Sequence, residues 1–131
     1  MIVPVSTKTS FALPGMSPGV KAHGPYLFVS GQVALDQTGE IVGRGDFERQ
    51  VAQVMSNLSE ILVAGGAGFE TVVKLGVFLA DRKYLPTWRT QRSNYFSDPF
   101  PASTLIIAKL ISPDFLIEVE AIAVLKSEIQ S

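Results

Sequence analysis

The sequence predicts an α+β domain in which two helices cover one face of a single β-sheet. The chain has 131 residues, the size of one domain, so we expect one hydrophobic core and a single domain spanning residues 1–131. Apolar residues occur in short strand-like runs before residue 46, at helical spacing from 46 to 62, and again in short runs after residue 72. The resulting order, β-β-β-α-β-α-β-β, is typical of a sheet with helices on one side.

Three strands are predicted in the first third of the chain. Residues 1–19 are rich in Pro and Gly and predict a short strand followed by a loop. The apolar run 26–29 predicts a second strand, which Ser30 and Gly31 would end. The segment 36–39 predicts a hairpin turn that leads into a third strand over residues 40–42.

Two helices are predicted in the middle of the chain. Asp46 is a suitable N-cap for the first helix, and the glycine-rich run 64–68 would end it. Asp81 is a suitable N-cap for the second helix, which ends before the prolines at positions 99 and 101. The apolar positions are Phe47, Val51, Val54, Met55, Leu58, Ile61 and Leu62 in the first helix, and Leu85, Trp88, Tyr95 and Phe96 in the second.

The remaining strands are predicted over residues 72–79, 104–108 and 116–124, with a turn at 112–114. The first two of these strands carry apolar residues at both even and odd positions, which is typical of strands buried on both faces. Two helices cover only one face of such a sheet. We therefore expect further copies of the chain to cover the other face, because most soluble assemblies are homo-oligomers.

Composition excludes several classes of function. The net charge of −1 provides no field to attract nucleic acid or an anionic membrane, so partners of both kinds are disfavoured. The chain has no cysteine and one histidine, which excludes disulfides, thiolate nucleophiles and metal sites built from Cys or several His residues. No apolar run approaches the roughly 18 residues of a membrane-spanning helix, and the N-terminus does not resemble a signal peptide. We therefore expect a cytoplasmic protein with no metal site.

Two carboxylates are the strongest candidates for chemistry. Glu118 and Glu120 lie two residues apart in the last predicted strand, so both side chains project from one face, about 7 Å apart along the strand. Ile122 continues that face, so the acids border an apolar surface where a carboxylate could act as a general acid or base. The alternative is that both face solvent or pair with Lys109 or an arginine. Taken alone, the residues favour this alternative.

Two hydroxyl-bearing segments are weaker candidates. Ser30 and Gly31 follow an apolar strand, where a glycine allows backbone N–H groups to approach a ligand closely, or where the pair simply forms a β-bulge. Ser103 and Thr104 begin a strand and could hold a carboxylate, but no His or Cys lies nearby in sequence to make either a nucleophile. The arginines of the second predicted helix are best interpreted as the edge of a packed face rather than a nucleic-acid platform.

Short motifs along nearly the whole chain point to one known family. They are Phe28-Val29-Ser30-Gly31-Gln32, Thr38-Gly39-Glu40, Gly65-Gly66-Ala67-Gly68, Val77-Phe78-Leu79-Ala80-Asp81, Asn94-Tyr95-Phe96, Phe100-Pro101-Ala102 and Ile117-Glu118-Val119-Glu120-Ala121-Ile122-Ala123-Val124. In this order they resemble the RidA (YjgF/YER057c/UK114) family. The resemblance implies a chorismate-mutase-like protomer of the Bacillus type with a mixed sheet, in a homotrimer whose sheets pack inward and whose ligand sites lie between subunits. It also implies hydrolysis of reactive enamine or imine metabolites to keto acids and ammonia, with no cofactor or metal.

The site residues of the family correspond to particular positions here. Its Ser-Gly pair falls on Ser30 and Gly31, and its site glutamate falls on Glu120. The resemblance therefore implies that Glu120 is the catalytic residue, and that Ser30 and the Gly31 N–H orient the ligand. The N-terminal tyrosine of the family falls at Met16 or Ser17, which makes Ser17 a candidate substrate-binding residue.

One departure from the family bears directly on activity. The arginine that grips the substrate carboxylate falls on Ser103. Losing such a contact in a shielded cleft costs about 2–5 kcal/mol, roughly a thirtyfold to several-thousandfold loss in rate. Either Ser103 and Thr104 bind a less charged ligand, or a cation such as Lys109, Arg92 or Arg44 replaces the arginine.

Two functions from different classes remain open at this point. One is a RidA-like hydrolase or deaminase of an arginine-lacking subgroup, with weak activity of the usual kind. The other is a non-catalytic trimer that binds a metabolite or another protein. The ribonuclease activity that older family names mention is disfavoured by the low net charge and the single histidine.

Overall fold

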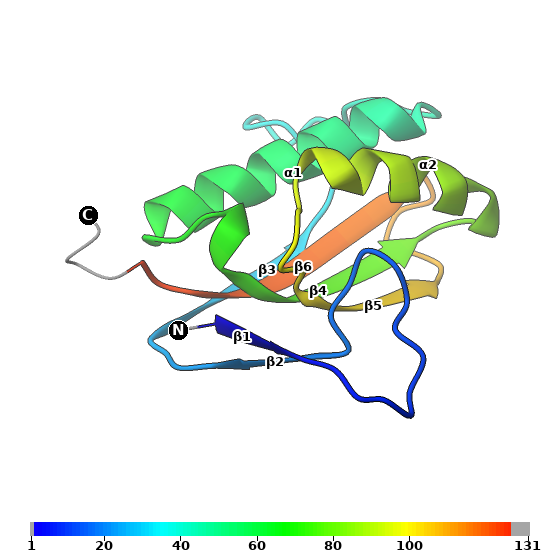
Figure 1. Ribbon diagram of the computed structural model, residues 1–131. Helices are drawn as coiled ribbons and strands as arrows, with labels where there is room; N and C mark the ends of the chain where they lie inside the picture. The colour runs from blue at the N-terminus through cyan, green and yellow to red at the C-terminus, as the bar shows by residue number, and fades with distance from the viewer. Residues whose placement is uncertain (1, 127–131) are drawn as a thin grey trace.

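In the computed structural model, which describes residues 2–126, both helices lie on the same face of a four-stranded sheet (Figure 1). The strands are β3 (Tyr26–Gln32), β6 (Ile117–Val124), β4 (Val72–Leu79) and β5 (Ala102–Ile107), in that order across the sheet. β4 and β5 run parallel and the other neighbours are antiparallel, so the sheet is mixed. The predicted α+β fold with two helices on one face is confirmed.

Helix α1 (Phe47–Ala64) begins and ends as predicted, whereas α2 (Leu85–Gln91) is shorter. The Asp46 side chain accepts a hydrogen bond from the Arg49 backbone N–H at 3.2 Å, and Gly65 ends α1. Asp81 does not cap α2 itself. It caps the 3-10 turn Arg82–Tyr84, which leads into α2, and the chain leaves α2 through further 3-10 geometry at Arg92–Asn94.

The first third of the chain differs from the prediction. β1 (Ile2–Val5) pairs with β2 (Gly19–Ala22), a strand that was not predicted, and together they form a separate antiparallel ribbon. The predicted strand over 40–42 is wrong, because that segment makes only an isolated bridge between Leu35 and Ile41. The turn before it does form, since the Asp36 carboxylate accepts hydrogen bonds from Thr38 and from the Glu40 N–H. The predicted order β-β-β-α-β-α-β-β therefore holds with a different set of strands.

The two faces of the sheet have different surroundings. Leu75, Val77 and Val119 face the helices and are buried, with the rest of the core. We call the other side of the sheet the open face. The residues that project from it are Tyr26, Phe28, Lys74, Gly76, Phe78, Thr104, Ile106, Glu118, Glu120 and Ile122. Phe28 is 72% exposed and Ile106 is 47% exposed, so a large apolar part of the open face is uncovered within one chain.

Candidate functional site

A pocket of about 210 Å³, which we call the sheet-face pocket, lies on the open face beside Glu120. Its walls come from three neighbouring strands, with Phe28 and Val29 from β3, Lys74 and Gly76 from β4, and Glu120, Ala121 and Ile122 from β6. The strand register produces this arrangement, because Gly76 lies opposite Glu120 on one side and opposite Thr104 on the other. Thr104, Gly76 and Glu120 therefore form a row across β5, β4 and β6.

The Glu120 carboxylate lies over the backbone of Gly76. A Cβ atom added at Gly76 would stand 2.7 Å from Glu120 Cγ and 2.9 Å from Oε2, closer than real Cβ contacts. A glycine in the interior of a strand often marks such a close approach. The absence of a side chain at this position thus allows Glu120 to lie flat against the sheet and border the pocket.

Lys74 is a pocket residue that the sequence analysis missed. Its Nζ donates a hydrogen bond to Thr104 Oγ1 at 3.0 Å. Within residues 2–126 the ion pairs are Arg44–Asp114 and Lys126–Glu70, so Lys74 and Glu120 take part in neither. The pocket therefore places an ammonium and a carboxylate near each other on adjacent strands, both available to a ligand. The signal that could have found Lys74 is a single charged residue in an otherwise apolar strand.

Ser30 and Gly31 lie outside the sheet-face pocket in a single protomer. The pairing of β3 with β6 shifts register between Val29 and Gln32, so the Ser30-Gly31 pair is the site of a β-bulge. A Cβ atom at Gly31 would collide with the Glu118 carboxylate. Ser30 is exposed, and Gly31 borders a separate, polar groove of about 720 Å³ against α1. Both predicted acids do project from the open face, Glu120 into the pocket and Glu118 toward Gly31.

Ser17 and Ser103 both lie near the start of β5, where Ser17 bridges to Ala102. The Ser17 N–H donates to the Pro101 carbonyl at 3.1 Å, and its hydroxyl donates to the Phe100 carbonyl. The buried Ser17 hydroxyl therefore holds the backbone that enters β5. Ser103 pairs with Leu75, whose side chain faces the helices, so Ser103 projects away from Thr104 and Glu120.

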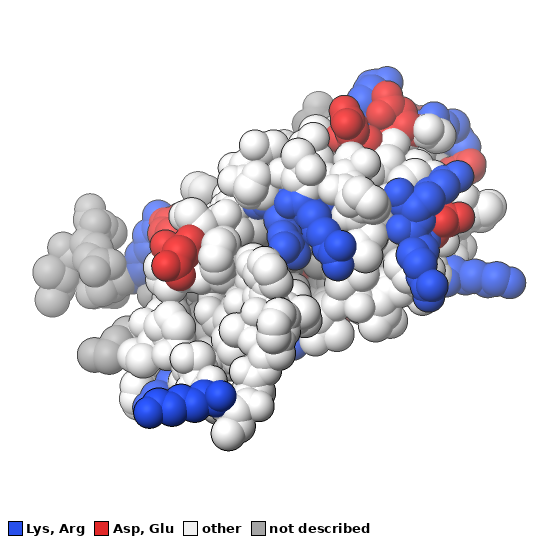
Figure 2. All heavy atoms as spheres, turned by 45° about the vertical axis from the view of Figure 1, so that its right-hand side comes forward, with Lys and Arg blue, Asp and Glu red and all other residues white. Residues whose placement is uncertain are grey.

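Ser103 borders a second pocket, of about 170 Å³, which we call the α2 pocket. It is lined by Gly15, Leu75, Trp88, Arg89, Arg92, Ser93, Phe96, Phe100, Pro101 and Ser103. Figure 2 shows Lys and Arg side chains gathered over the part of the surface that carries α2. Arg92 Nη2 donates to the Pro14 carbonyl at 2.9 Å. Burial lowers the pKa of Arg92, and the positive charge of Arg89 lowers this pKa further.

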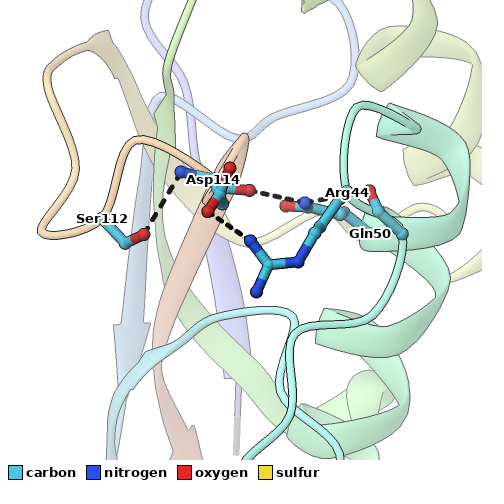
Figure 3. A network of polar contacts seen from close by, with 5 residues as sticks. Arg44, Gln50, Ser112 and Asp114 are labelled. Atoms are coloured by element: carbon cyan, nitrogen blue, oxygen red, sulfur yellow. Dashed lines mark hydrogen bonds and ion pairs between the residues drawn. The ribbon is translucent and has the colours of Figure 1, made fainter.

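Lys109, Arg92 and Arg44 were the three candidates to replace the family's arginine, and they lie in different places in the structure. Arg92 lines the same pocket as Ser103. Arg44 is directed at Asp114, with which it forms an ion pair in the loop before β6 (Figure 3). Lys109 lies beyond the end of β5 and lines neither the sheet-face pocket nor the α2 pocket. Arg92 is therefore the cation that stands beside Ser103.

Residues 2–126 contain neither a cluster of metal ligands nor a membrane-spanning helix. No group of three or more His, Asp or Glu side chains in this part of the chain could hold a metal ion. Across the same residues, no helix has the length and apolar character needed to cross a membrane.

Comparison with known proteins identifies related sequences along most of the chain. Residues 8–125 match the family described as Endoribonuclease L-PSP. A RutC family protein of Pyrococcus horikoshii is 38% identical over 108 residues, which cover 82% of this chain and 84% of that protein. The 2-iminobutanoate/2-iminopropanoate deaminase of Mus musculus is 36% identical over 113 residues, covering 79% of this chain and 83% of that protein.

Solved structures show the same relationship. A Rid family protein of unknown function from Yersinia pestis, YyfB, superposes with a TM-score of 0.86 at 31% identity, over 95% of this chain and 98% of its own. RidA from a Psychrobacter species superposes with a TM-score of 0.71 at 28% identity, over 93% of each chain. The resemblance seen in the sequence motifs is thereby confirmed, and this chain belongs to the Endoribonuclease L-PSP family, which includes the RutC and RidA proteins.

Proposed function

We propose that this protein is a cofactor-free hydrolase of small enamine or imine metabolites, in which Glu120 activates water. The observation that carries the proposal is the sheet-face pocket, where the Glu120 carboxylate lies over Gly76 and Lys74 lines the adjacent wall. The relative from Mus musculus is named for deaminating 2-iminobutanoate and 2-iminopropanoate, which belong to this substrate class. The family of the chain and the chemistry of the pocket thus support the same reaction.

The reaction consumes one water and releases one ammonia. An enamine first tautomerises to the imine. Glu120 accepts a proton from water as the water oxygen bonds to the imine carbon, and the imine nitrogen takes up a proton, which gives a carbinolamine. The carbon–nitrogen bond then breaks, the hydroxyl gives up its proton, and ammonia leaves behind a carbonyl group. Because Lys74 donates to the oxygen of Thr104, the O–H of Thr104 is free to donate to the ligand.

We further propose that the working form is a homotrimer whose open faces pack inward. Its support is the apolar surface that one chain leaves uncovered, including Phe28 and Ile106, together with a groove of about 740 Å³ between β2 and the open face. Burying such surface is favourable by about 25 cal/mol per Å². In this assembly Ser30 and Gly31 of one copy would orient a ligand in a cleft shared with its neighbour.

The test is the release of ammonia from 2-aminoacrylate generated in the assay, compared between the wild type and Glu120→Gln. General acid–base catalysis contributes about 10²–10⁴-fold, so Glu120→Gln should lose activity by that factor. Glu118→Gln is the matched control, because Glu118 projects from the same face two residues earlier and does not line the pocket. It should retain most of the wild-type rate. Equal rates for the wild type and Glu120→Gln, both at buffer background, would reject the hydrolase.

A non-catalytic ligand-binding trimer is the second candidate, and Ser103 favours it. The family's arginine is replaced there by a side chain that has no positive charge to form an ion pair with a carboxylate. Ser103→Arg should raise ammonia release if the pockets otherwise suit the reaction. No gain, together with a wild-type rate at background, would leave ligand binding as the function.

A further inference from the structure

Lys74 carries a primary amine that the proposed reaction does not use as a nucleophile. Of the lysines in residues 2–126, only Lys74 lies in the four-stranded sheet, where its side chain projects from the open face and lines the sheet-face pocket. In the reaction proposed above, it only donates a hydrogen bond to Thr104. A lysine amine beside a ligand can also form a covalent bond to a carbonyl carbon.

The Lys74 amine and the Glu120 carboxylate flank the bare backbone of Gly76. Lys74 Nζ donates to Thr104 Oγ1 at 3.0 Å, and Thr104 lies opposite Gly76 on β5. Glu120 lies opposite Gly76 on β6, and its carboxylate rests over the glycine. Because Gly76 has no side chain and borders the pocket, a small molecule above it would meet the amine on one side and the carboxylate on the other.

The Lys74 amine is not neutralised by a carboxylate. Lys126 forms an ion pair with Glu70 at 2.8 Å, but among the residues that the structure describes neither Lys74 nor Glu120 takes part in an ion pair. The partner of Lys74 is the neutral hydroxyl of Thr104, which fixes the position of the nitrogen. Once the amine has lost a proton, its lone pair is therefore available to a ligand in the pocket.

The remaining walls and the size of the sheet-face pocket limit the ligand. These walls are apolar and consist of Phe28, Val29, Ala121 and Ile122. The volume of about 210 Å³ corresponds to about seven water molecules at roughly 30 Å³ each, which is below the range of about 300–1,000 Å³ that drug-sized ligands need. Glu120 would repel a carboxylate on the ligand. A carbonyl compound that fits is therefore short, aliphatic and uncharged.

We propose that Lys74 captures short aliphatic aldehydes as a reversible imine, with Glu120 moving the protons. The ammonium gives one proton to Glu120, and the neutral nitrogen bonds to the carbonyl carbon. A second proton passes from nitrogen to the carbonyl oxygen, which gives a carbinolamine. Glu120 returns its proton to the hydroxyl, water leaves, and the nitrogen lone pair forms the C=N bond of a protonated imine. One aldehyde is consumed and one water is released, with no oxidation or reduction.

Reductive trapping detects this imine directly. The full chain is incubated with butanal and sodium cyanoborohydride, which adds hydride to the C=N bond and leaves a stable butyl group on the nitrogen. Intact-mass spectrometry counts the butyl groups, and peptide mapping locates them. Lys74 should be labelled at least about tenfold faster than any other lysine, because general acid–base catalysis contributes about 10²–10⁴-fold. Without cyanoborohydride, dialysis should remove the adduct, because the imine is reversible.

Variants decide which groups carry out the capture. Lys74→Arg should abolish the fast label, although its guanidinium can still donate to Thr104. Lys21→Arg is the matched control, because Lys21 is an exposed strand lysine beside an apolar groove that no carboxylate of residues 2–126 lines. This variant should label Lys74 at the wild-type rate. Glu120→Gln should slow the labelling of Lys74 at least about tenfold.

Three results would overturn the proposal. They are the absence of a fast label, equal labelling rates at Lys74 and Lys21 in the wild type, and labelling of Lys74 at the wild-type rate in a folded Glu120→Gln variant. If Lys74→Arg fails to fold, the peptide map of the wild type decides the question, because it compares lysines within one molecule.

The capture of aldehydes uses the pocket of the proposed hydrolase but does not require ammonia release, which is measured separately. Fast labelling of Lys74 in a protein that releases no ammonia would keep this inference and reject the hydrolase. Ammonia release without fast labelling would do the reverse.

Discussion

Replacing Gly76 with alanine should move Glu120 without damaging the sheet. The new Cβ would lie 2.7 Å from Glu120 Cγ, whereas carbon atoms make their best contact at about 3.5–4.0 Å. The Glu120 side chain must therefore retreat by about 1 Å, and within one chain it has room to do so because it is exposed. A displacement of about 1 Å can cost roughly 100-fold in rate, so we expect kcat for ammonia release to fall by about that factor.

Stability should change in the opposite direction. Glycine inside a strand is less favourable than alanine by about 0.5–1 kcal/mol, so the urea midpoint of Gly76→Ala should stay the same or rise. Gly19→Ala is the matched control, because it adds the same methyl group to strand β2 at an ordinary distance of 3.7 Å from Val5 Cβ. A wild-type rate for Gly76→Ala, alongside an inactive Glu120→Gln, would show that catalysis does not require Glu120 to lie against Gly76.

Three further changes test the fold, the turn before α1 and the assembly. Gln50 is fully buried, and its side-chain amide forms hydrogen bonds with three backbone groups of two loops. Gln50→Leu should therefore lower the free energy of unfolding, measured in urea, by at least about 3 kcal/mol, whereas Gln37→Leu, at an exposed position, should not. A loss below about 1 kcal/mol for Gln50→Leu would contradict this. Hydrogen bonds from its own turn, led by the Thr38 hydroxyl, lower the pKa of Asp36 below 3.8, so its stabilisation is complete above that pH and is lost as the pH falls through the lower folded-state pKa. The difference in urea midpoint between Asp36→Ala and the wild type should therefore be largest near pH 7 and shrink as the pH falls below 3.8, and a constant difference would refute the assignment. Phe28→Asp should convert the proposed trimer to monomers in sedimentation velocity, and an unchanged sedimentation coefficient would count against packing through the open face.

Local patterns predicted the elements that depend on neighbouring residues. Helix α1 follows from an N-cap at Asp46, an apolar stripe and a glycine stop at Gly65, all within one segment. The shared face of Glu118 and Glu120 follows from the two-residue period of a strand, and the structure confirms it.

Pairing between distant segments was harder to predict. β2 is a strand because β1 lies beside it, and the segment 40–42 lacks such a partner beyond one bridge. The apolar content of residues 19–22 and 40–42 does not distinguish these two cases. A short strand is stable only when another strand satisfies its backbone groups, and that partner is not encoded in its own residues.

The sequence by itself determined the α+β class, helix α1, the family and the face on which the acids lie. Only the tertiary structure decided that Glu120 rests on Gly76, that Lys74 bonds to Thr104, and that Arg92 stands beside Ser103. The physical reason is that the period of a segment fixes the direction of each side chain, whereas strand order and register fix which side chains meet. Those two quantities depend on contacts between residues far apart in the chain, which no local pattern records.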